Sequence, residues 1–371
     1  MSLPAVILVG GLGTRLRPLT DRTRKDMLPL VDRPQLAYTF EHLRRFGVTR
    51  AIISCGYLPT QIQEHFGKRY GDLELEYKVE EEPLGTGGAI RFAAESLDEP
   101  FFALNGDSLR ETDLGALVDV HRERQGRATI LLTPVEDPSR YGLVRVHGGD
   151  GRVLSFLEKP RPEEIDTNLI NAGLYVLEPD VLDLIPSGRP ISIEREVFPR
   201  LVEEESVYGV ALPGYWLDIG TPDAYLQAHR DVLERNFVTE LGDRLGPDYT
   251  LVADGAVTAE ARLVPPVFIG AGARIGAGAR IGSLAVIGAG AMVGAGASVE
   301  SSVIGASAVV GPRTHVSGSI VGEEAELGAD CDVRGLCVVG PGARVGERNM
   351  LDHGMRVAAD ETIAAGAVSF S

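Results

Sequence analysis

The carboxyl-terminal third of the chain carries a six-residue repeat that few folds can accommodate. Aliphatic residues recur every six positions from Leu251 to Ile363, with two steps of five, at Ile304 and Val321. Glycine and alanine fill most positions between them, as in the segment IGAGAR at 269–274. One inward aliphatic per six residues, with small residues at the turns, is the pattern of a parallel β-helix with three repeats to a coil. The repeat predicts six to seven coils over residues 251–371, because a disordered Gly/Ala-rich tail would not keep this register.

The first 236 residues have a different pattern, in which short apolar strands alternate with amphipathic helices. Strands are expected over 5–9, 51–55, 75–79, 101–104 and 129–133, and helices over 35–46, 60–66, from 86, and over 114–125. This alternation predicts an α/β domain with a Rossmann-like, mostly parallel sheet and ligands at the carboxyl ends of its strands. A closing helix is expected after Asp223. Residues 237–250 are expected to be the linker between this domain, 1–236, and the repeat domain, 251–371.

Composition and charge restrict the classes of partner. The 371 residues carry a formal net charge of −17, which argues against a nucleic-acid-binding surface. Three widely separated cysteines, Cys55, Cys331 and Cys337, suggest reduced thiols in the core, with no disulfide framework. No run is long enough to span a membrane, and the amino-terminal apolar run is too short for a signal peptide. We therefore expect a cytoplasmic protein with no membrane partner.

A glycine-rich turn follows the first predicted strand. Gly10, Gly11 and Gly13 allow the backbone to approach an anion closely, and Arg15 and Lys25 follow within fifteen residues of Gly11. The segment lacks the lysine of a Walker A loop, and a leucine replaces the third glycine of the dinucleotide fingerprint. Two interpretations remain: a polyphosphate site of another kind, or a turn whose glycines serve only close packing.

The segment GGLGTRLRPLT at 10–20, followed by Lys25 and by MLP at 27–29, resembles the signature of the nucleotide-sugar pyrophosphorylases, or sugar-1-phosphate nucleotidylyltransferases. Strand-end carboxylates in LNGD, 104–107, and YWLDIGTP, 215–222, match the family's metal-binding aspartates. The resemblance implies that Asp107 and Asp218 bind Mg²⁺ and that Arg15 and Lys25 contact the NTP phosphates. These four residues are the expected catalytic set. Families with such repeats also imply a left-handed β-helix.

Further motifs of this family extend along the first domain. The resemblance implies nucleotide contacts from the loop EPLGTGG at 82–88 and from the glycine turn, through Gly10, Gly11, Gly13, Thr14, Gly85, Thr86, Asn105 and Gly106. It implies a sugar-phosphate site formed by Tyr141, Gly142, Glu158, Lys159 and Asn171.

From the residues alone, purely structural roles stay open for these motifs. The aspartates could be helix caps or turn residues, the 82–88 loop a Gly-rich helix entry capped by Thr86, and Glu158-Lys159 a surface charge pair. Trp216 could be a sugar platform or a core anchor. The family commonly has prolines on both sides of its lysine, where this chain has Arg24 and Asp26. Their loss predicts a more mobile Lys25, with a structural ion pair as its alternative role.

The expected reaction is transfer of a nucleotidyl group from an NTP to a sugar 1-phosphate, giving an NDP-sugar and pyrophosphate. Within the family the chain looks most like the mannose-1-phosphate guanylyltransferases, which implies GTP and mannose 1-phosphate. An adenylyl-, uridylyl- or thymidylyltransferase acting on glucose 1-phosphate or another sugar phosphate is the alternative. A non-catalytic nucleotide-sugar-sensing subunit and a bifunctional acyltransferase using His315 or His353 are also open. The repeat domain predicts a homo-oligomer, a dimer or tetramer.

Overall fold

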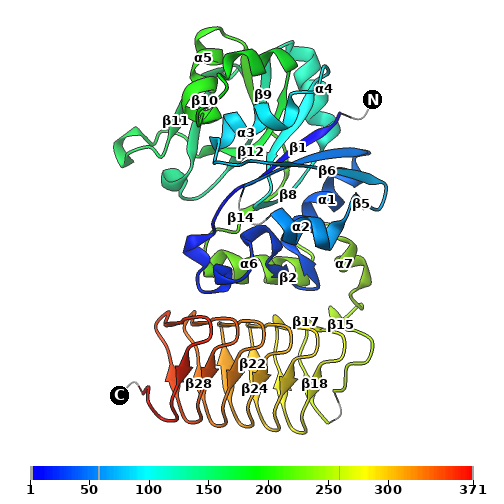
Figure 1. Cartoon of the computed structure of the whole chain (residues 1–371), viewed down its shortest axis with the longest axis vertical. Helices are drawn as coiled ribbons and strands as arrows, with labels where there is room; N and C mark the ends of the chain where they lie inside the picture. Colours follow the sequence, from blue (N-terminus) through cyan, green and yellow to red (C-terminus); the bar gives the residue numbers. More distant parts are fainter. Residues whose placement is uncertain (1–2, 57–58, 259, 370–371) are drawn as a thin grey trace. The chain divides into compact units, whose positions relative to one another are not determined.

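The computed structural model describes residues 3–56, 59–258 and 260–369 (Figure 1). The chain packs as two compact units. The first contains Met1–Gly11 and Tyr38–Trp216, and the second contains Leu12–Ala37 and Leu217–Ser371. Most of the glycine-arginine segment therefore packs with the carboxyl-terminal part of the chain, although it directly follows a strand of the first unit.

The sheet of the first unit has a parallel centre. Strand β1 (Ala5–Val9) lies between β4 (Arg50–Cys55) and β7 (Phe101–Asn105), parallel to both, and β6 (Leu73–Val79) extends the sheet beyond β4. The apolar strands β1, β4 and β7 are almost fully buried, as parallel strands with covered faces are, whereas β6 is only partly buried. Strand β12 (Leu169–Leu177) pairs antiparallel with β7 and joins this centre to the other strands. Those strands are β9 (Ala128–Pro134), β10 (Gly142–Val146), β11 (Val153–Glu158) and β13 (Val207–Ala211). At the opposite end of the sheet, β5 (Arg69–Tyr70) pairs antiparallel with β6.

The predicted alternation of strands and helices is confirmed, and the sheet is Rossmann-like. Residues Val6, Ile52, Ile90 and Phe101 belong to one buried cluster, which joins the parallel strands to the helix that follows β6. A separate two-stranded sheet is formed by β8 (Ser108–Thr112) and β14 (Gly214–Asp218). The helices are α1 (Gln35–Arg45), α2 (Pro59–Phe66), α3 (Gly85–Ala94), α4 (Leu114–Arg124) and α5 (Phe198–Glu203).

The second unit begins with three short 3-10 turns and a hairpin. These are η1 (Thr14–Leu16), η2 (Leu19–Asp21) and η3 (Lys25–Met27), then β2 (Pro29–Leu30) and β3 (Arg33–Pro34). The expected closing helix is α6 (Pro222–Leu233), which starts at the Thr221 cap with proline in its first turn. The segment 237–250 contains a further helix, α7 (Glu240–Arg244).

The hexapeptide repeat forms three parallel sheets, which contain seven, six and six strands. Every aliphatic residue at the repeat position from Ile269 to Val357 is buried in one continuous core. The first sheet consists of β15 (Thr250–Val252), β17 (Val267–Ile269), β20 (Ala285–Ile287), β23 (Val303–Ile304), β26 (Ile320–Val321), β29 (Val338–Val339) and β32 (Arg356–Val357).

The other two sheets complete each coil. The second consists of β16 (Arg262–Leu263), β19 (Arg280–Ile281), β22 (Ser298–Glu300), β25 (His315–Ser317), β28 (Asp332–Val333) and β31 (Met350–Leu351). The third consists of β18 (Arg274–Ile275), β21 (Met292–Val293), β24 (Val309–Val310), β27 (Glu326–Leu327), β30 (Arg344–Val345) and β33 (Thr362–Ile363). The predicted number of coils is confirmed.

Two further expectations concern cysteines and membranes. Cys55, Cys331 and Cys337 are buried thiols that form no disulfide, as predicted. Within the described ranges, none of the helices has the length and apolar character that crossing a bilayer requires.

Candidate active site

The three glycines of the first turn differ in their surroundings. Gly13 has a φ of 61°, and a Cβ there would lie 2.9 Å from Thr20 Cγ2 and 3.0 Å from Lys25 Cβ. The Thr20 hydroxyl donates to the Gly13 carbonyl at 2.9 Å, which closes the segment on itself. Gly10 and Gly11 are exposed and have open space where a Cβ would stand. Close packing therefore explains Gly13 but not Gly10 and Gly11, whose bare backbone is open to a ligand.

Arg15 and Lys25 meet at one carboxylate in the second unit. Arg15 Nη2 lies 3.7 Å from Asp218 Oδ2, and Lys25 Nζ lies 3.5 Å from Asp218 Oδ1. The Arg15 side chain is 61% exposed, so its guanidinium can turn to an incoming anion, whereas Lys25 is only 5% exposed. Gly220 makes room for this arrangement, since a Cβ there would overlap the Arg15 guanidinium. The structure thus brings together three of the four predicted catalytic residues.

The predicted mobility of Lys25 is wrong. Arg24, Lys25 and Asp26 are all buried, and Arg24 Nη2 forms a 3.0 Å ion pair with Asp26 Oδ2. Lys25 begins the turn η3, where the Leu28 amide donates to its carbonyl. Burial and the Arg24–Asp26 pair fix this segment in place of the missing prolines. Lys25 also forms the ion pair of the alternative interpretation, with Nζ 3.5 Å from Asp218 Oδ1.

The turn at 105–107 joins β7 to β8 in the first unit. The Gly106 amide donates to the Leu8 carbonyl at 2.9 Å, and a Cβ at Gly106 would lie 2.7 Å from Val9 Cγ1. Only glycine fits against β1 here, and this fit sets the direction of the next residue, Asp107. The turn therefore places Asp107 at the carboxyl edge of the parallel strands, where the sequence predicted it.

Sequence reasoning missed Arg110, which lies behind this turn. Its guanidinium is buried and donates to the Asn105 carbonyl at 3.0 Å. Burial lowers the pKa of Arg110 to about 10, and the nearby Asp107 carboxylate opposes that shift. Arg110 therefore adds positive potential beside Asp107 while supporting the turn from within. The strand 108–112 has the sequence SLRET, with a single aliphatic residue and a second charge at Glu111, so only the charge itself could have pointed to Arg110.

The predicted base-reading loop 82–88 is held by a distant segment of the first unit. The Thr86 hydroxyl donates to Glu194 Oε2 at 2.7 Å and accepts from the Ile193 amide at 3.0 Å. The residue before α3 is Leu84, which has no side-chain cap, so the predicted capping role of Thr86 is wrong. Gly85 packs on the Ile191 backbone, and the Gly87 amide donates to the Ile191 carbonyl at 2.8 Å. The residues 191–194 that hold this loop have no motif that would reveal the role.

Four of the predicted sugar-phosphate residues lie together where the start of β10 pairs with the end of β11. Gly142 pairs with Glu158, and the Lys159 amide donates to the Tyr141 carbonyl at 3.1 Å. Burial and the Glu194 carboxylate raise the pKa of Glu158, although Lys159 opposes the shift. Since Glu194 also accepts from the base-reading loop, the two predicted subsites share this residue.

Trp216 lies between Tyr141 and the loop after Asn171. Its ring is edge-to-face with Tyr141, with 5.3 Å between centroids, and its Nε1 donates to the Ala172 carbonyl at 2.9 Å. The indole is half-buried, so one part anchors the structure and another part faces outward.

Asn171 shapes an irregular part of β12, between Asn171 and Tyr175. Its amide donates to the Tyr175 hydroxyl at 2.8 Å, and its carbonyl oxygen accepts from the Gly173 amide at 3.0 Å. Gly173, with φ 66°, lies against Asn105, since a Cβ there would be 2.6 Å from Asn105 Nδ2. The sugar-side strand and the Asp107 turn are therefore in direct contact in the first unit.

The metal prediction rests on few ligands. Among the described residues there is no group of three or more His, Cys, Asp or Glu placed to hold a metal ion. Mg²⁺ commonly takes only one or two carboxylates and completes its shell with water and substrate phosphates. Asp107 and Asp218 are chemically suited to this, and because they belong to different units their pairing is part of the proposal below.

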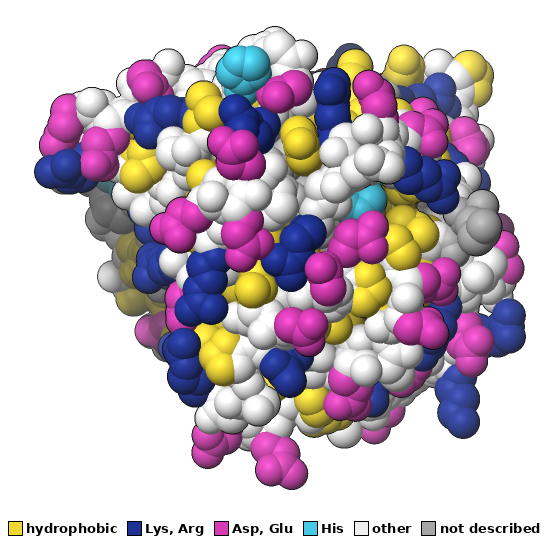
Figure 2. All heavy atoms as spheres, turned by 90° about the horizontal axis from the view of Figure 1, so that it is seen from above, with side chains coloured by type: hydrophobic (Ala, Val, Ile, Leu, Met, Phe, Trp, Pro, Cys, Tyr) yellow, Lys and Arg dark blue, Asp and Glu magenta, His cyan; other side chains and the backbone are white. Residues whose placement is uncertain are grey.

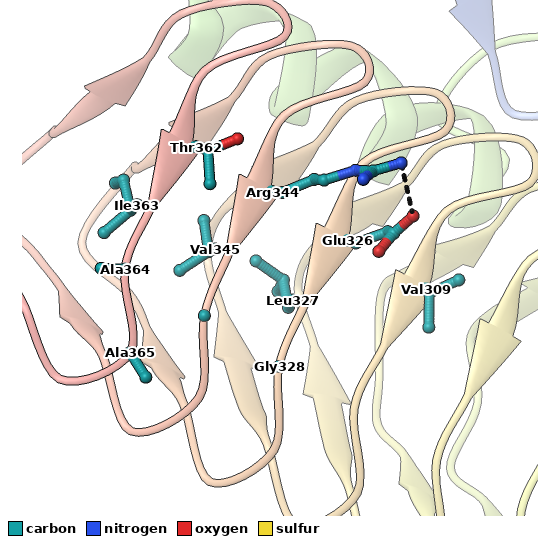
Figure 3. A pocket seen from close by; sticks show the side chains of 11 residues that line it. Val309, Glu326, Leu327, Gly328, Arg344, Val345, Thr362, Ile363, Ala364 and Ala365 are labelled. Atoms are coloured by element: carbon teal, nitrogen blue, oxygen red, sulfur yellow. Dashed lines mark ion pairs between the residues drawn. The ribbon is translucent and has the colours of Figure 1, made fainter.

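Two hollows are lined by other residues. One, of about 740 Å³, is lined in the first unit by residues such as His121, Arg127 and Glu178. The other, of about 420 Å³, crosses β27, β30 and β33, with the Arg344–Glu326 ion pair near it (Figure 3). The described residues that line this hollow include neither His315 nor His353. His353 is exposed beside Asp352, as expected of a solvated turn.

Comparison with known proteins decides the family. Residues 4–235 match the nucleotidyl transferase family. The chain belongs to this nucleotidyl transferase family. Residues 263–366 match a second family, the GMPPB C-terminal domain. The predicted family and the two-part fold are therefore confirmed.

Several relatives resemble the chain over most of its length. The mannose-1-phosphate guanylyltransferase of Mycobacterium tuberculosis is 40% identical over 274 residues, covering 72% of this chain and 75% of that protein. Mannose-1-phosphate guanylyltransferase 1 of Arabidopsis thaliana is 38% identical over 278 residues, covering 71% and 75%. Among solved structures, HddC from Yersinia pseudotuberculosis is 30% identical with a TM-score of 0.54, covering 61% of this chain and 98% of that chain.

Proposed function

We propose that the protein is a Mg²⁺-dependent sugar-1-phosphate nucleotidyltransferase that makes GDP-mannose from GTP and mannose 1-phosphate. The observation that carries this proposal is the meeting of Arg15 and Lys25 at Asp218, in a segment that follows the unpacked glycines Gly10 and Gly11. Two cations, Arg15 and Lys25, that follow exposed backbone amides in the sequence suit a polyphosphate. The Asp218 carboxylate suits a polyphosphate that is bound to a metal ion.

The reaction needs no general base, because the attacking phosphate oxygen of the sugar 1-phosphate is already ionised. That oxygen forms a bond to the α-phosphorus of the NTP as the bond to pyrophosphate breaks, and the electron pair leaves with pyrophosphate. Arg15 and the Gly10–Gly11 amides hold the β- and γ-phosphates, and Lys25 neutralises charge near the α-phosphate. Mg²⁺ held by Asp107 and Asp218 would supply further neutralisation and alignment of the phosphates.

The sugar phosphate is assigned to the first unit. Lys159 is exposed and carries the charge for its phosphate, and the Glu158 carboxylate can accept from a sugar hydroxyl. Tyr141 directly precedes β10, and Asn171 lies on β12, which pairs with β10. The choice of guanine and mannose rests on the names of the relatives, which are mannose-1-phosphate guanylyltransferases at 38% and 40% identity.

The partners follow from the same proposal. The substrates are an NTP and a sugar 1-phosphate, and we propose a homo-oligomeric, cytoplasmic enzyme with no nucleic-acid partner. On the face drawn in Figure 2, acidic and basic side chains are interspersed, without the broad basic patch that nucleic acid requires. Light scattering after size-exclusion chromatography measures whether the chain is a dimer or tetramer.

A panel assay tests the reaction. Four NTPs are combined with mannose 1-phosphate, glucose 1-phosphate and other hexose 1-phosphates, and pyrophosphate release is measured with Mg²⁺ and then with EDTA. We expect the highest kcat/KM for GTP with mannose 1-phosphate and no release in EDTA. A different preferred pair would replace the substrate assignment, and full activity in EDTA would contradict the metal. No release with any pair would favour a sensing subunit.

A further inference from the structure

On the first sheet of the β-helix, the side chains in register on the outer side are apolar until the last strand, where the residue is an arginine. Successive positions in register are Leu251, Phe268, Val286, Val303, Ile320, Val338 and finally Arg356. Leu251, expected to be the first inward residue of the repeat, is therefore on the outward side, because its neighbour Val252 pairs with the inward Ile269. These positions point away from the core because neighbours such as Ile269 point into it. Six apolar residues are followed by one arginine, which the repeat itself does not require.

Arg356 contacts the glycine-arginine segment of the same unit. Its Nη1 donates to the Arg15 carbonyl at 3.0 Å and to the Arg17 carbonyl at 2.6 Å. These carbonyls lie at the end of η1, where a helical turn has no partners of its own for its last carbonyls. A guanidinium suits this position because several N–H groups lie in one plane. Arg356 therefore closes the carboxyl end of the turn that carries Arg15.

A second contact holds the segment a few residues further on. The Arg22 guanidinium bonds to the Asp360 carboxylate, and its Nη1 lies 3.6 Å from Glu324 Oε2. A Cβ at Gly342 would lie 2.9 Å from Arg22 Nη2. Positions 324, 342 and 360 are equivalent turns of three successive coils, since a coil contains three six-residue repeats. The Arg22 guanidinium thus lies along the turns of these coils.

We propose that Arg356 is a positioning residue for phosphate binding, which holds the backbone of η1 so that the Arg15 guanidinium stays at the nucleotide phosphates. This inference rests on the proposed function for its effect on catalysis, while the effect on the η1 backbone does not. Arg356 touches the backbone of Arg15 and not its guanidinium, so it acts through Arg15. Through Arg356, the β-helix would support the nucleotide site in addition to serving as a scaffold.

The contact is exposed, so its loss should loosen the turn without unfolding the β-helix. Val357, the neighbouring residue, keeps its place in the core. Arg344 provides the matched control, because it lies two repeats before Arg356, on β30 of the third sheet, and forms an ion pair with Glu326 on the neighbouring strand β27. Arg344→Ala removes a surface arginine from the same part of the β-helix without touching η1.

The test compares Arg356→Ala, Arg356→Lys and Arg344→Ala in the full chain. In Arg356→Ala we expect faster hydrogen exchange at the Leu16 and Arg17 amides, which bond to Gly13 and Thr14. We also expect about a tenfold weaker Kd for GTP and a KM for GTP raised by the same factor, while KM for mannose 1-phosphate and Tm stay unchanged. Arg356→Lys should restore part of the loss, and Arg344→Ala should match wild type.

Unchanged exchange at these amides together with unchanged GTP affinity in Arg356→Ala would overturn the positioning role. An equal loss in Arg344→Ala would also overturn it, because the effect would then be a general one of the β-helix surface. If Arg356→Ala fails to fold, Arg356→Lys decides by the same two readouts. A wild-type protein that releases no pyrophosphate would remove the proposed function, and the exchange measurement would still decide whether Arg356 orders η1.

Discussion

Lys25 Nζ lies 3.5 Å from the Asp218 carboxylate, although 193 residues separate the two in the chain. The same carboxylate faces Arg15, so one acidic side chain pairs with two cations. Incoming phosphates would take over both cations and leave Asp218 oxygen atoms for a metal. Under the proposed function, the two cations would then neutralise the phosphates and the carboxylate would bind the metal.

Replacing Asp107 tests the metal assignment. Asp107→Ala should reduce kcat by about 100- to 1000-fold, because a ligand to Mg²⁺ and a counter-charge to Arg110 are both removed. Pyrophosphate release is measured over a range of Mg²⁺ concentrations. Asp113→Asn is the control, because Asp113 caps α4 through the Ala116 amide and asparagine caps equally well. Wild-type turnover in Asp107→Ala would eliminate Asp107 as a ligand.

A methyl group at Gly220 tests the placement of Arg15. Gly220→Ala would push the Arg15 guanidinium away from Asp218, and the fold should survive because the far end of a flexible side chain can move. We expect KM for GTP to rise about tenfold, with Tm nearly unchanged. Gly148→Ala serves as the control, since a Cβ there meets nothing within 4 Å. If both variants bind GTP like wild type, GTP binding does not depend on the position of the Arg15 guanidinium beside Asp218.

Gly173 links the sugar side to the Asp107 turn. Gly173→Ala should lower Tm and also lower kcat, because the added Cβ would push Asn105 next to Asp107. Gly188 has a similarly positive φ, 82°, but open space around it. Gly188→Ala therefore reports only the stability lost by placing a side chain in the left-handed region, about 1–2 kcal/mol. Thermal unfolding and initial rates of both variants are compared. Equal loss of kcat in the two variants would show that the Asn105 contact is irrelevant.

Acid should destabilise the protein through His229. Burial lowers the pKa of His229 to about 3, and the Nδ1 atom accepts from the Val31 amide at 3.2 Å. The folded pKa lies below the unfolded value, so the unfolded chain binds the proton first as pH falls below about 6.5. Stability should therefore decrease by about 1.4 kcal/mol per pH unit for this group between pH 6.5 and 3.

His229→Asn should remove this part of the acid sensitivity, because the amide oxygen can accept from Val31 but does not titrate in this range. The free energy of unfolding is measured by urea at several pH values. The buried His42, whose pKa burial lowers to about 4, remains in the variant, so some acid dependence should persist. An unchanged pH slope in His229→Asn would contradict the assignment.

The sequence predicted the repeat domain closely because a β-helix is a local, periodic structure. Each inward aliphatic, such as Ile269 or Val357, needs only its own repeat to define its side of the coil, and the five-residue steps at Ile304 and Val321 were visible in the spacing. The strand ends at Val9 and Asn105 were predictable for the same reason, since apolar runs end where polar and glycine residues begin.

The partners of the site residues could not be predicted in this way. Thr86 was expected to cap its own helix, but its hydroxyl bonds to Glu194, 108 residues away. Lys25 was expected to be mobile, but the Arg24–Asp26 pair and burial fix it. Arg110 gave only the weak signal of a charge in a strand. The partner of each of these side chains depends on which group, distant in sequence, is close enough in space to form the hydrogen bond or ion pair. Composition and periodicity carry no information about such pairings.

The sequence by itself therefore determined the two fold classes and the family, and it named the candidate residues for the phosphate chemistry, because motif and period are properties of short segments. Only the tertiary structure decided that Arg15 and Lys25 share Asp218, and that Arg356 closes the turn that carries Arg15. The physical reason is that hydrogen bonds and ion pairs are made in space, between groups that lie up to 341 residues apart in this chain.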